Sequence, residues 1–140
     1  MREILFRGKN IDLEWVAGDL LQNGVDYKTA IRIKAYDGEN YYSEVVRVIS
    51  ETVGQFTGLT DKNGKKIFEG DIVKYKNTDG IKFNGVALTV IGKVVYNEKN
   101  ASFAISGKDE IGAKHYDYFP IKNIEAIGNT HDNPELLKGG

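Results

Sequence analysis

The sequence predicts a mainly β protein, and three of its features carry that prediction. Its 140 residues include 16 glycines but only two prolines, together with eight tyrosines and six phenylalanines. This composition favours short strands joined by tight turns. Several segments also alternate apolar and polar residues with the period of two that half-buried strands have. A chain of this length buries roughly 70% of its unfolded surface, so one domain over residues 1–140 is expected to fold without disulfides, and cysteine is absent.

The N-terminal subregion, residues 1–50, is predicted to form an antiparallel sheet. The expected strands are residues 2–7, 15–22, 29–36 and 41–49. Short turn signals rich in glycine, asparagine and aspartate separate them. One alternative stays open at the end of this subregion. Three apolar residues between 43 and 51 also have the spacing of one helix face, which would give a helix there.

The central stretch, residues 52–75, is predicted to start the second subregion with a compact β nucleus. Asn63-Gly64 lies between two apolar segments, and this pair is typical of a type I′ hairpin turn, whose two central residues both have positive φ. The sequence Glu69-Gly70-Asp71 breaks the chain again before an apolar run. We therefore expect a strand, a tight turn, a short strand, a bend and a further strand in succession.

The rest of the second subregion, residues 51–140, is predicted to complete a small, partly open β-barrel on which the N-terminal sheet packs. The expected segments are a polar loop over 76–80, a turn over 83–85, a strand over 86–95 with a bulge or close approach at Gly92, a strand over 101–105, a loop over 107–114 and strands over 116–119 and 121–127. Asn133, Pro134 and Gly139 have the positions that begin and end one turn of C-terminal helix. By analogy, such a barrel would resemble Src-homology or Tudor domains.

Segments near the start, centre and end of the chain resemble the YopX family, small proteins encoded mainly by bacteriophages and prophages. They are FRGK at 6–9, WVAGDL at 15–20, TVGQFTGL at 52–59, DKNGK at 61–65, FEGDIV at 68–73, IGN at 127–129 and NPELL at 133–137. Two departures are Ala17, where an aromatic residue is expected, and Thr130, where an apolar one is expected. The resemblance is loosest over 76–125. It implies the fold and a phage or prophage origin, but it offers no catalytic or binding residues to carry over.

Charge and motif content argue against most enzyme classes. The formal charge is −1, from 19 basic and 20 acidic residues, so no overall field attracts nucleic acid or membrane. The glycines form no phosphate-binding motif, and the two histidines, His115 and His131, lack the spacing of metal ligands. Glu69 and Asp71 could divide acid and base roles, but a turn explains both better, so a hydrolase ranks last. We predict no catalytic, cofactor-binding or metal-binding residue.

The start of the chain bears on its location. The segment Met1-Arg2-Glu3 is charged and lacks the apolar run of a signal peptide, and no stretch is long enough to span a bilayer. We therefore expect a protein of the bacterial cytoplasm with no membrane partner.

Nucleic-acid binding is the most specific functional prediction. The stretch between 52 and 76 has five lysines against three carboxylates, and a tyrosine lies between two of the lysines. Cations beside aromatic faces suit phosphate contact and base stacking. The candidate contacts are Lys62, Lys65, Lys66, Lys74, Tyr75 and Lys76. The alternative is that these lysines only solvate a hairpin tip and protect a sheet edge.

Exposed aromatic residues predict a second kind of surface. Neighbouring residues of a strand point to opposite faces, so adjacent tyrosines cannot all enter one core. The candidates for self-association or partner binding are Tyr41, Tyr42, Tyr116 and Tyr118. The sequence thus predicts a non-catalytic accessory protein that binds nucleic acid, or alternatively a homo-oligomeric interaction module without nucleic-acid affinity.

Overall fold

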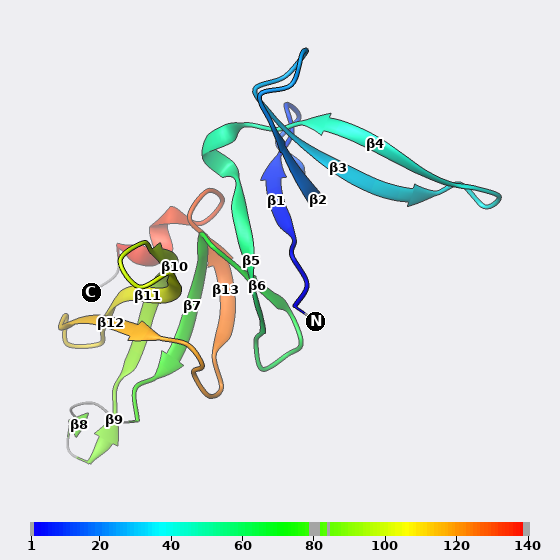
Figure 1. Cartoon of the computed structure of the whole chain (residues 1–140). Coiled ribbons are helices and arrows are strands. Elements are labelled where there is room, and N and C mark those ends of the chain that lie inside the picture. Colours follow the sequence, from blue (N-terminus) through cyan, green and yellow to red (C-terminus); the bar gives the residue numbers. More distant parts are fainter. Residues whose placement is uncertain (1, 79–81, 84, 139–140) are drawn as a thin grey trace. The chain divides into compact units, whose positions relative to one another are not determined.

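The computed structural model describes residues 2–78, 82–83 and 85–138, and its fold is mainly β as predicted (Figure 1). The chain forms two compact units, residues 1–58 and 59–140. Helical structure in the described parts of the chain is confined to two 3-10 turns, η1 (Ser50–Thr52) and η2 (Pro134–Leu137). The second of these is the predicted C-terminal turn, although Gly139 lies outside the described residues. None of the helices in these ranges has the length and apolar character needed to cross a membrane.

The first unit is built from antiparallel strands in the order β4-β3-β2-β1-β5. The strands are β1 (Phe6–Lys9), β2 (Trp15–Gln22), β3 (Thr29–Tyr36), β4 (Tyr41–Arg47) and β5 (Gly54–Thr60). Strands β2 and β3 have the predicted bounds, whereas the first strand begins at Phe6 rather than at residue 2. The unit ends later than the predicted subregion boundary, because the first residues of β5 pair with β1.

The helix considered over 43–51 is wrong. Most of those residues belong to β4, which pairs with β3 over seven consecutive positions, from Tyr36 opposite Tyr41 to Ala30 opposite Arg47. Figure 1 shows the resulting β3–β4 hairpin as a long ribbon. Tyrosine and valine dominate β4, and such residues suit a pleated strand better than a helix. Only one 3-10 turn follows the strand.

The second unit is an antiparallel sheet of five strands in the order β12-β11-β10-β7-β13. Its strands are β7 (Asp71–Lys76), β10 (Thr89–Asn97), β11 (Ser102–Asp109), β12 (Lys114–Tyr118) and β13 (Glu125–Asn129). Strand β6 (Lys66–Phe68) follows β5 in strand order, and β8 (Lys82–Phe83) with β9 (Val86–Ala87) forms a separate hairpin. The edge strands β12 and β13 do not pair with each other, so the predicted barrel is open. Residues 79–81 and 84 of the predicted loop and turn lie outside the described residues.

The core of the second unit follows from the alternation of its strands. Seven buried side chains come together from β6, β7, β10, β11 and the segment before β13. They are Ile67, Val73, Tyr75, Val90, Val94, Ile105 and Ile124. On β7, the inward residues Val73 and Tyr75 alternate with the exposed Lys74 and Lys76. The strand therefore presents apolar side chains to the core and lysines to solvent.

Gly92 is a point of close approach between strands, as predicted. It pairs with Gly107 across β10 and β11. A Cβ atom at Gly92 would lie 2.7 Å from the carbonyl oxygen of Ser106 and 2.8 Å from the Cα of Gly107. No side chain fits at that separation, so glycine is required here for steric reasons.

Three details of the second unit differ from the sequence predictions. Strand β11 continues to Asp109, so the loop expected over 107–114 is reduced to the residues between β11 and β12. The last strand begins at Glu125 rather than at residue 121. In the central turn, Gly64 has a φ of 81° but Asn63 is not at positive φ, so the turn is not type I′. It is a turn closed by Asp61, whose carbonyl accepts the N–H of Gly64.

Candidate functional site

Two buried carboxylates of the central stretch, Asp61 and Asp71, stabilise the local backbone by accepting hydrogen bonds from N–H groups. Asp61 is 6% exposed and accepts the backbone N–H groups of Asn63 and Lys65 at 2.9 Å and that of Ala126 at 3.0 Å. Burial opposes the charged form, but the three N–H groups together lower the pKa of Asp61. Asp71 is 1% exposed and accepts the N–H of Phe68 at 2.8 Å. These residues of the central stretch therefore act in folding.

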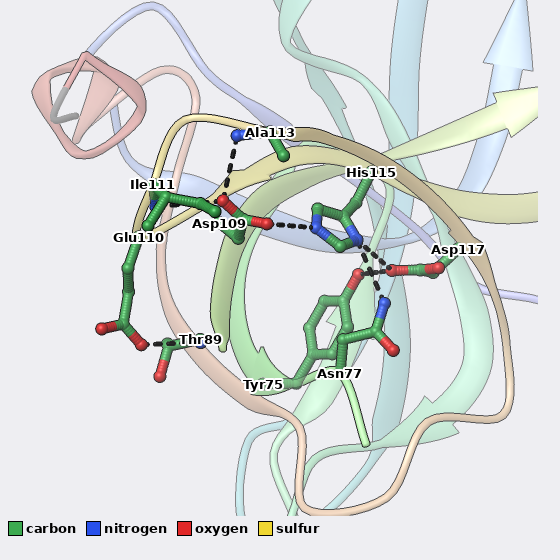
Figure 2. A network of polar contacts seen from close by, with 9 residues as sticks. All are labelled: Tyr75, Asn77, Thr89, Asp109, Glu110, Ile111, Ala113, His115 and Asp117. Atoms are coloured by element: carbon green, nitrogen blue, oxygen red, sulfur yellow. Dashed lines mark hydrogen bonds and ion pairs between the residues drawn. The ribbon is translucent and has the colours of Figure 1, made fainter. Parts of the chain in front are cut away.

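A polar network crosses the second unit at the end of its core (Figure 2). Strand pairing places its members on one face of the sheet, because Asp117 lies opposite Ile105 and His115 lies opposite Gly107. The Tyr75 hydroxyl donates a hydrogen bond to the Asp117 carboxylate. Farther along the same face, His115 Nε2 lies 2.8 Å from Asp109 Oδ2.

Both ring nitrogens of His115 are engaged. Nδ1 lies 3.0 Å from the side-chain nitrogen of Asn77 and 3.8 Å from Asp117 Oδ2, and Nε2 contacts Asp109. The neutral imidazole satisfies the two hydrogen bonds when Nε2 carries the proton, since Nδ1 then accepts from the amide. A general base needs a free nitrogen for its substrate. His115 therefore has a structural role: it links β12 to the end of β11 and to the residue that follows β7.

The charges of this network are stabilised locally. The hydrogen bond from His115 lowers the pKa of Asp109, against the opposing effect of burial, and the N–H groups of Ile111 and Ala113 add to it. The N–H of Thr89, 2.7 Å from Glu110, lowers the pKa of that carboxylate. Burial raises the pKa of Tyr75, as do its hydrogen bond to Asp117 and the carboxylate charge. Sequence reasoning missed the network because residues 107–114 were expected to be a loop, whereas the hairpin of β11 and β12 creates it.

A cleft of about 750 Å³ lies on the second unit beside this network. We call it the lysine cleft, after the four lysines that line it, Lys62, Lys74, Lys76 and Lys122. Two carboxylates, Asp117 and Glu125, also line it. Glu125 lies 3.6 Å from the Lys62 ammonium and 3.9 Å from that of Lys74. These pairs are solvent-exposed, so they hold the lysines only weakly.

The structure brings together only some of the predicted nucleic-acid contacts. Three of the predicted lysines line the cleft, but Lys65 and Lys66 do not. Tyr75 also lines it, yet this residue is 4% exposed and its ring packs in the core, so no ring face is available to a base. Lys122 was missed because only the pairing of β13 with β7 brings its segment beside Lys74. No local sequence signal marks that pairing.

The four predicted interaction tyrosines are all exposed, but they lie in different places. Tyr41 and Tyr42 are on β4 of the first unit, 84% and 48% exposed. Tyr116 and Tyr118 are on β12 of the second unit, with their rings edge to face at 5.5 Å. Tyr118 is 45% exposed and lines the lysine cleft, so it offers the ring that Tyr75 does not.

Metal binding finds no support among the residues that the structure describes. No group of three or more histidine or acidic side chains in these ranges could hold an ion. At His131, the backbone N–H donates to the side chain of Asn129 at 3.0 Å, within the turn before η2.

Comparisons with known proteins agree with the fold. The family described as "YopX protein" matches residues 5–138, nearly the whole chain. Among solved structures, protein EF1440 from Enterococcus faecalis is similar, with a TM-score of 0.54 and 21% sequence identity over 98% of this chain and 99% of that one. At this identity the likeness concerns the fold alone. No curated protein matches the chain.

Proposed function

Because the chain belongs to the YopX family and its second unit has a cleft lined by four lysines and an exposed tyrosine, we propose that it is a non-catalytic protein that binds nucleic acid in this cleft. The observation that carries the proposal is the convergence of these side chains from three separate segments. Lys62, Lys74 with Lys76, and Tyr118 with Lys122 are separated in the sequence and come together only in the folded chain.

Electrostatics supports an anionic ligand at this place. The lysine cleft has four lysines against two carboxylates, although the whole chain has a charge of −1. One of the carboxylates, Asp117, already accepts a hydrogen bond from Tyr75. Cations that line a concave surface concentrate their field and attract phosphate groups. The exposed ring of Tyr118 adds a face on which a base can stack.

The proposal includes that the protein catalyses no reaction. The hydrogen bonds of His115 and Asp109 support this part. His115 uses both ring nitrogens inside the protein, and Asp109, its carboxylate partner, also binds two backbone N–H groups. A catalytic histidine needs one nitrogen for the reacting group. A ligand in the cleft would therefore be held and released unchanged.

The proposal also includes a phage or prophage origin and a place in the bacterial cytoplasm. The family's usual source, bacteriophages and prophages, supports both. Neighbouring genes test the origin. Structural or replication genes of a phage on both sides would support it, and an uninterrupted chromosomal operon would contradict it.

A second candidate function is a homo-oligomeric interaction module. The specific observation is strand β4, an edge strand with six of its seven residues exposed, including Tyr41 and Tyr42. Such edges pair readily with another chain. Sedimentation velocity over a concentration series tests it, because a strict monomer at high concentration would contradict self-association through β4.

The test of nucleic-acid binding compares two triple variants with the same change in charge. Lys74→Glu, Lys76→Glu and Lys122→Glu alter the lysine cleft, whereas Lys65→Glu, Lys66→Glu and Lys99→Glu alter lysines that do not line it. Fluorescence anisotropy with labelled oligonucleotides at low salt measures the affinity. We expect the cleft variant to lose at least about tenfold in affinity relative to the control variant. Equal losses in both variants, or no binding by the unaltered protein, would overturn the proposal.

A further inference from the structure

A second cleft of about 400 Å³ lies on the same unit and is also lined by lysines, Lys93, Lys108 and Lys114. We call it the second cleft. All three lysines are exposed. None of them forms an ion pair with a carboxylate among the residues that the structure describes. Three cationic side chains are thus available to a ligand here.

The two carboxylates that line the second cleft already have partners within the protein. Asp109 is 7% exposed and is held by His115 and two backbone N–H groups. Glu110 accepts the N–H of Thr89 at 2.7 Å. Asp109 is therefore directed into the protein and Glu110 is held at the surface by Thr89, while the lysines face solvent.

The second cleft and the lysine cleft meet at the polar network. Thr89 lines both clefts. Asn77, which lines the lysine cleft, is joined by a 3.0 Å hydrogen bond to His115, which lines the second cleft. Figure 2 shows the contact of Thr89 with Glu110 and that of Asn77 with His115. Together the clefts have seven lysines against four carboxylates.

We propose that the two clefts form one continuous track for a single-stranded nucleic acid, an inference that rests on the proposed function. The ligand would pass from the lysine cleft over Thr89 into the second cleft, with its phosphates along the lysines. Two features favour a single strand. Its bases can stack on Tyr118 and contact the apolar residues Ile91 and Leu136 of the second cleft. In a duplex, the base faces are stacked on one another, so these side chains would have no base to contact.

The salt dependence gives the track a measurable signature. For single strands, the slope of log K against log salt is about −0.7 for each phosphate neutralised. Contact with seven lysines predicts a slope of about −5, and contact with the four of the lysine cleft alone predicts about −3. Lengthening the oligonucleotide from about 4 to about 12 nucleotides should raise the affinity if both clefts are used.

The experiment measures slopes and affinities for the unaltered protein, for the triple variant Lys93→Glu, Lys108→Glu, Lys114→Glu and for the control variant at residues 65, 66 and 99. We expect the second-cleft variant to bind the long oligonucleotide at least about tenfold more weakly, with a slope near −3, and to bind the short one normally. Glutamine variants at the same lysines, with folding checked by circular dichroism, should shift the slope in the same direction.

The outcomes separate this inference from the proposed function. If the second-cleft variants bind the long oligonucleotide as the unaltered protein does, while lysine-cleft variants lose binding, the track is wrong and the proposed function stands. If duplex DNA binds as tightly as single strands, the single-stranded ligand is wrong. If the unaltered protein binds no nucleic acid, both proposals fall.

Discussion

Replacing Asp61 by alanine tests how the central stretch holds the second unit together. The carboxylate accepts three backbone N–H groups, from Asn63, Lys65 and Ala126, at 2.9 to 3.0 Å. A hydrogen bond to a charged group contributes about 1.5–3 kcal/mol. Water can replace the carboxylate at the two exposed turn residues, but less readily at the half-buried Ala126. We expect Asp61→Ala to lower the free energy of unfolding by about 3 kcal/mol.

The assay is urea unfolding followed by circular dichroism, and the matched control is Asp37→Ala. Asp37 also accepts two turn N–H groups, from Glu39 and Asn40, but it lies at an exposed hairpin tip. The control should unfold at nearly the same urea concentration as the unaltered protein. A loss below about 1 kcal/mol at Asp61, or equal losses in the two variants, would refute the reasoning.

The pH dependence of stability gives an independent check on Asp61. Its pKa in the folded state is lowered, so its contribution is fully present above the ordinary carboxyl pKa of about 3.9. That contribution is lost as the pH falls through the folded pKa, because the unfolded chain takes up the proton first. The unaltered protein should therefore lose stability more steeply below about pH 4 than Asp61→Ala does. Parallel curves would contradict the assignment.

Three further predictions concern the core, the network and the cleft. Gly92→Ala should cost about 1–3 kcal/mol in urea unfolding, since its Cβ would meet the facing strand, and a loss under about 0.5 kcal/mol would contradict the close approach. Burial raises the pKa of Tyr75, so the tyrosinate absorbance of Tyr75→Phe should match that of the unaltered protein until alkaline unfolding, and an earlier deficit would show that this phenol is accessible. Glu125→Gln frees the two lysines that it pairs with, so nucleic acid should bind more tightly and with a steeper salt slope, and weaker binding would count against the cleft.

Local alternation made much of the fold predictable. Strand β3 has the expected bounds, and from Ile31 to Tyr36 its more buried residues alternate with exposed ones as the sequence pattern predicts. The burial of Tyr75 also follows from its neighbours in the sequence. Lys74 and Lys76 occupy one face of β7, so the residue between them must face the core with Val73.

The remaining features depend on pairing between strands that are distant in the sequence. Lys122 joins the lysine cleft only because β13 pairs with β7, and the register places Glu125 opposite Lys74. His115 reaches Asp109 only because the β11–β12 hairpin places it opposite Gly107. The central turn was misjudged because Asn63-Gly64 suits a type I′ turn, whereas the buried carboxylate of Asp61 favours another. Such tertiary contacts leave no periodic signal in the local sequence.

The most direct test of the nucleic-acid proposal is a salt series with the unaltered chain and a labelled single-stranded oligonucleotide of about 12 nucleotides. The proposal predicts binding at low salt that weakens with a slope between about −3 and −5, depending on how many of the lysines contact phosphate. A steep slope that the lysine-cleft variant flattens would support phosphate contact in that cleft. Undetectable binding at the lowest salt would contradict it and would leave self-association through β4 as the function to pursue.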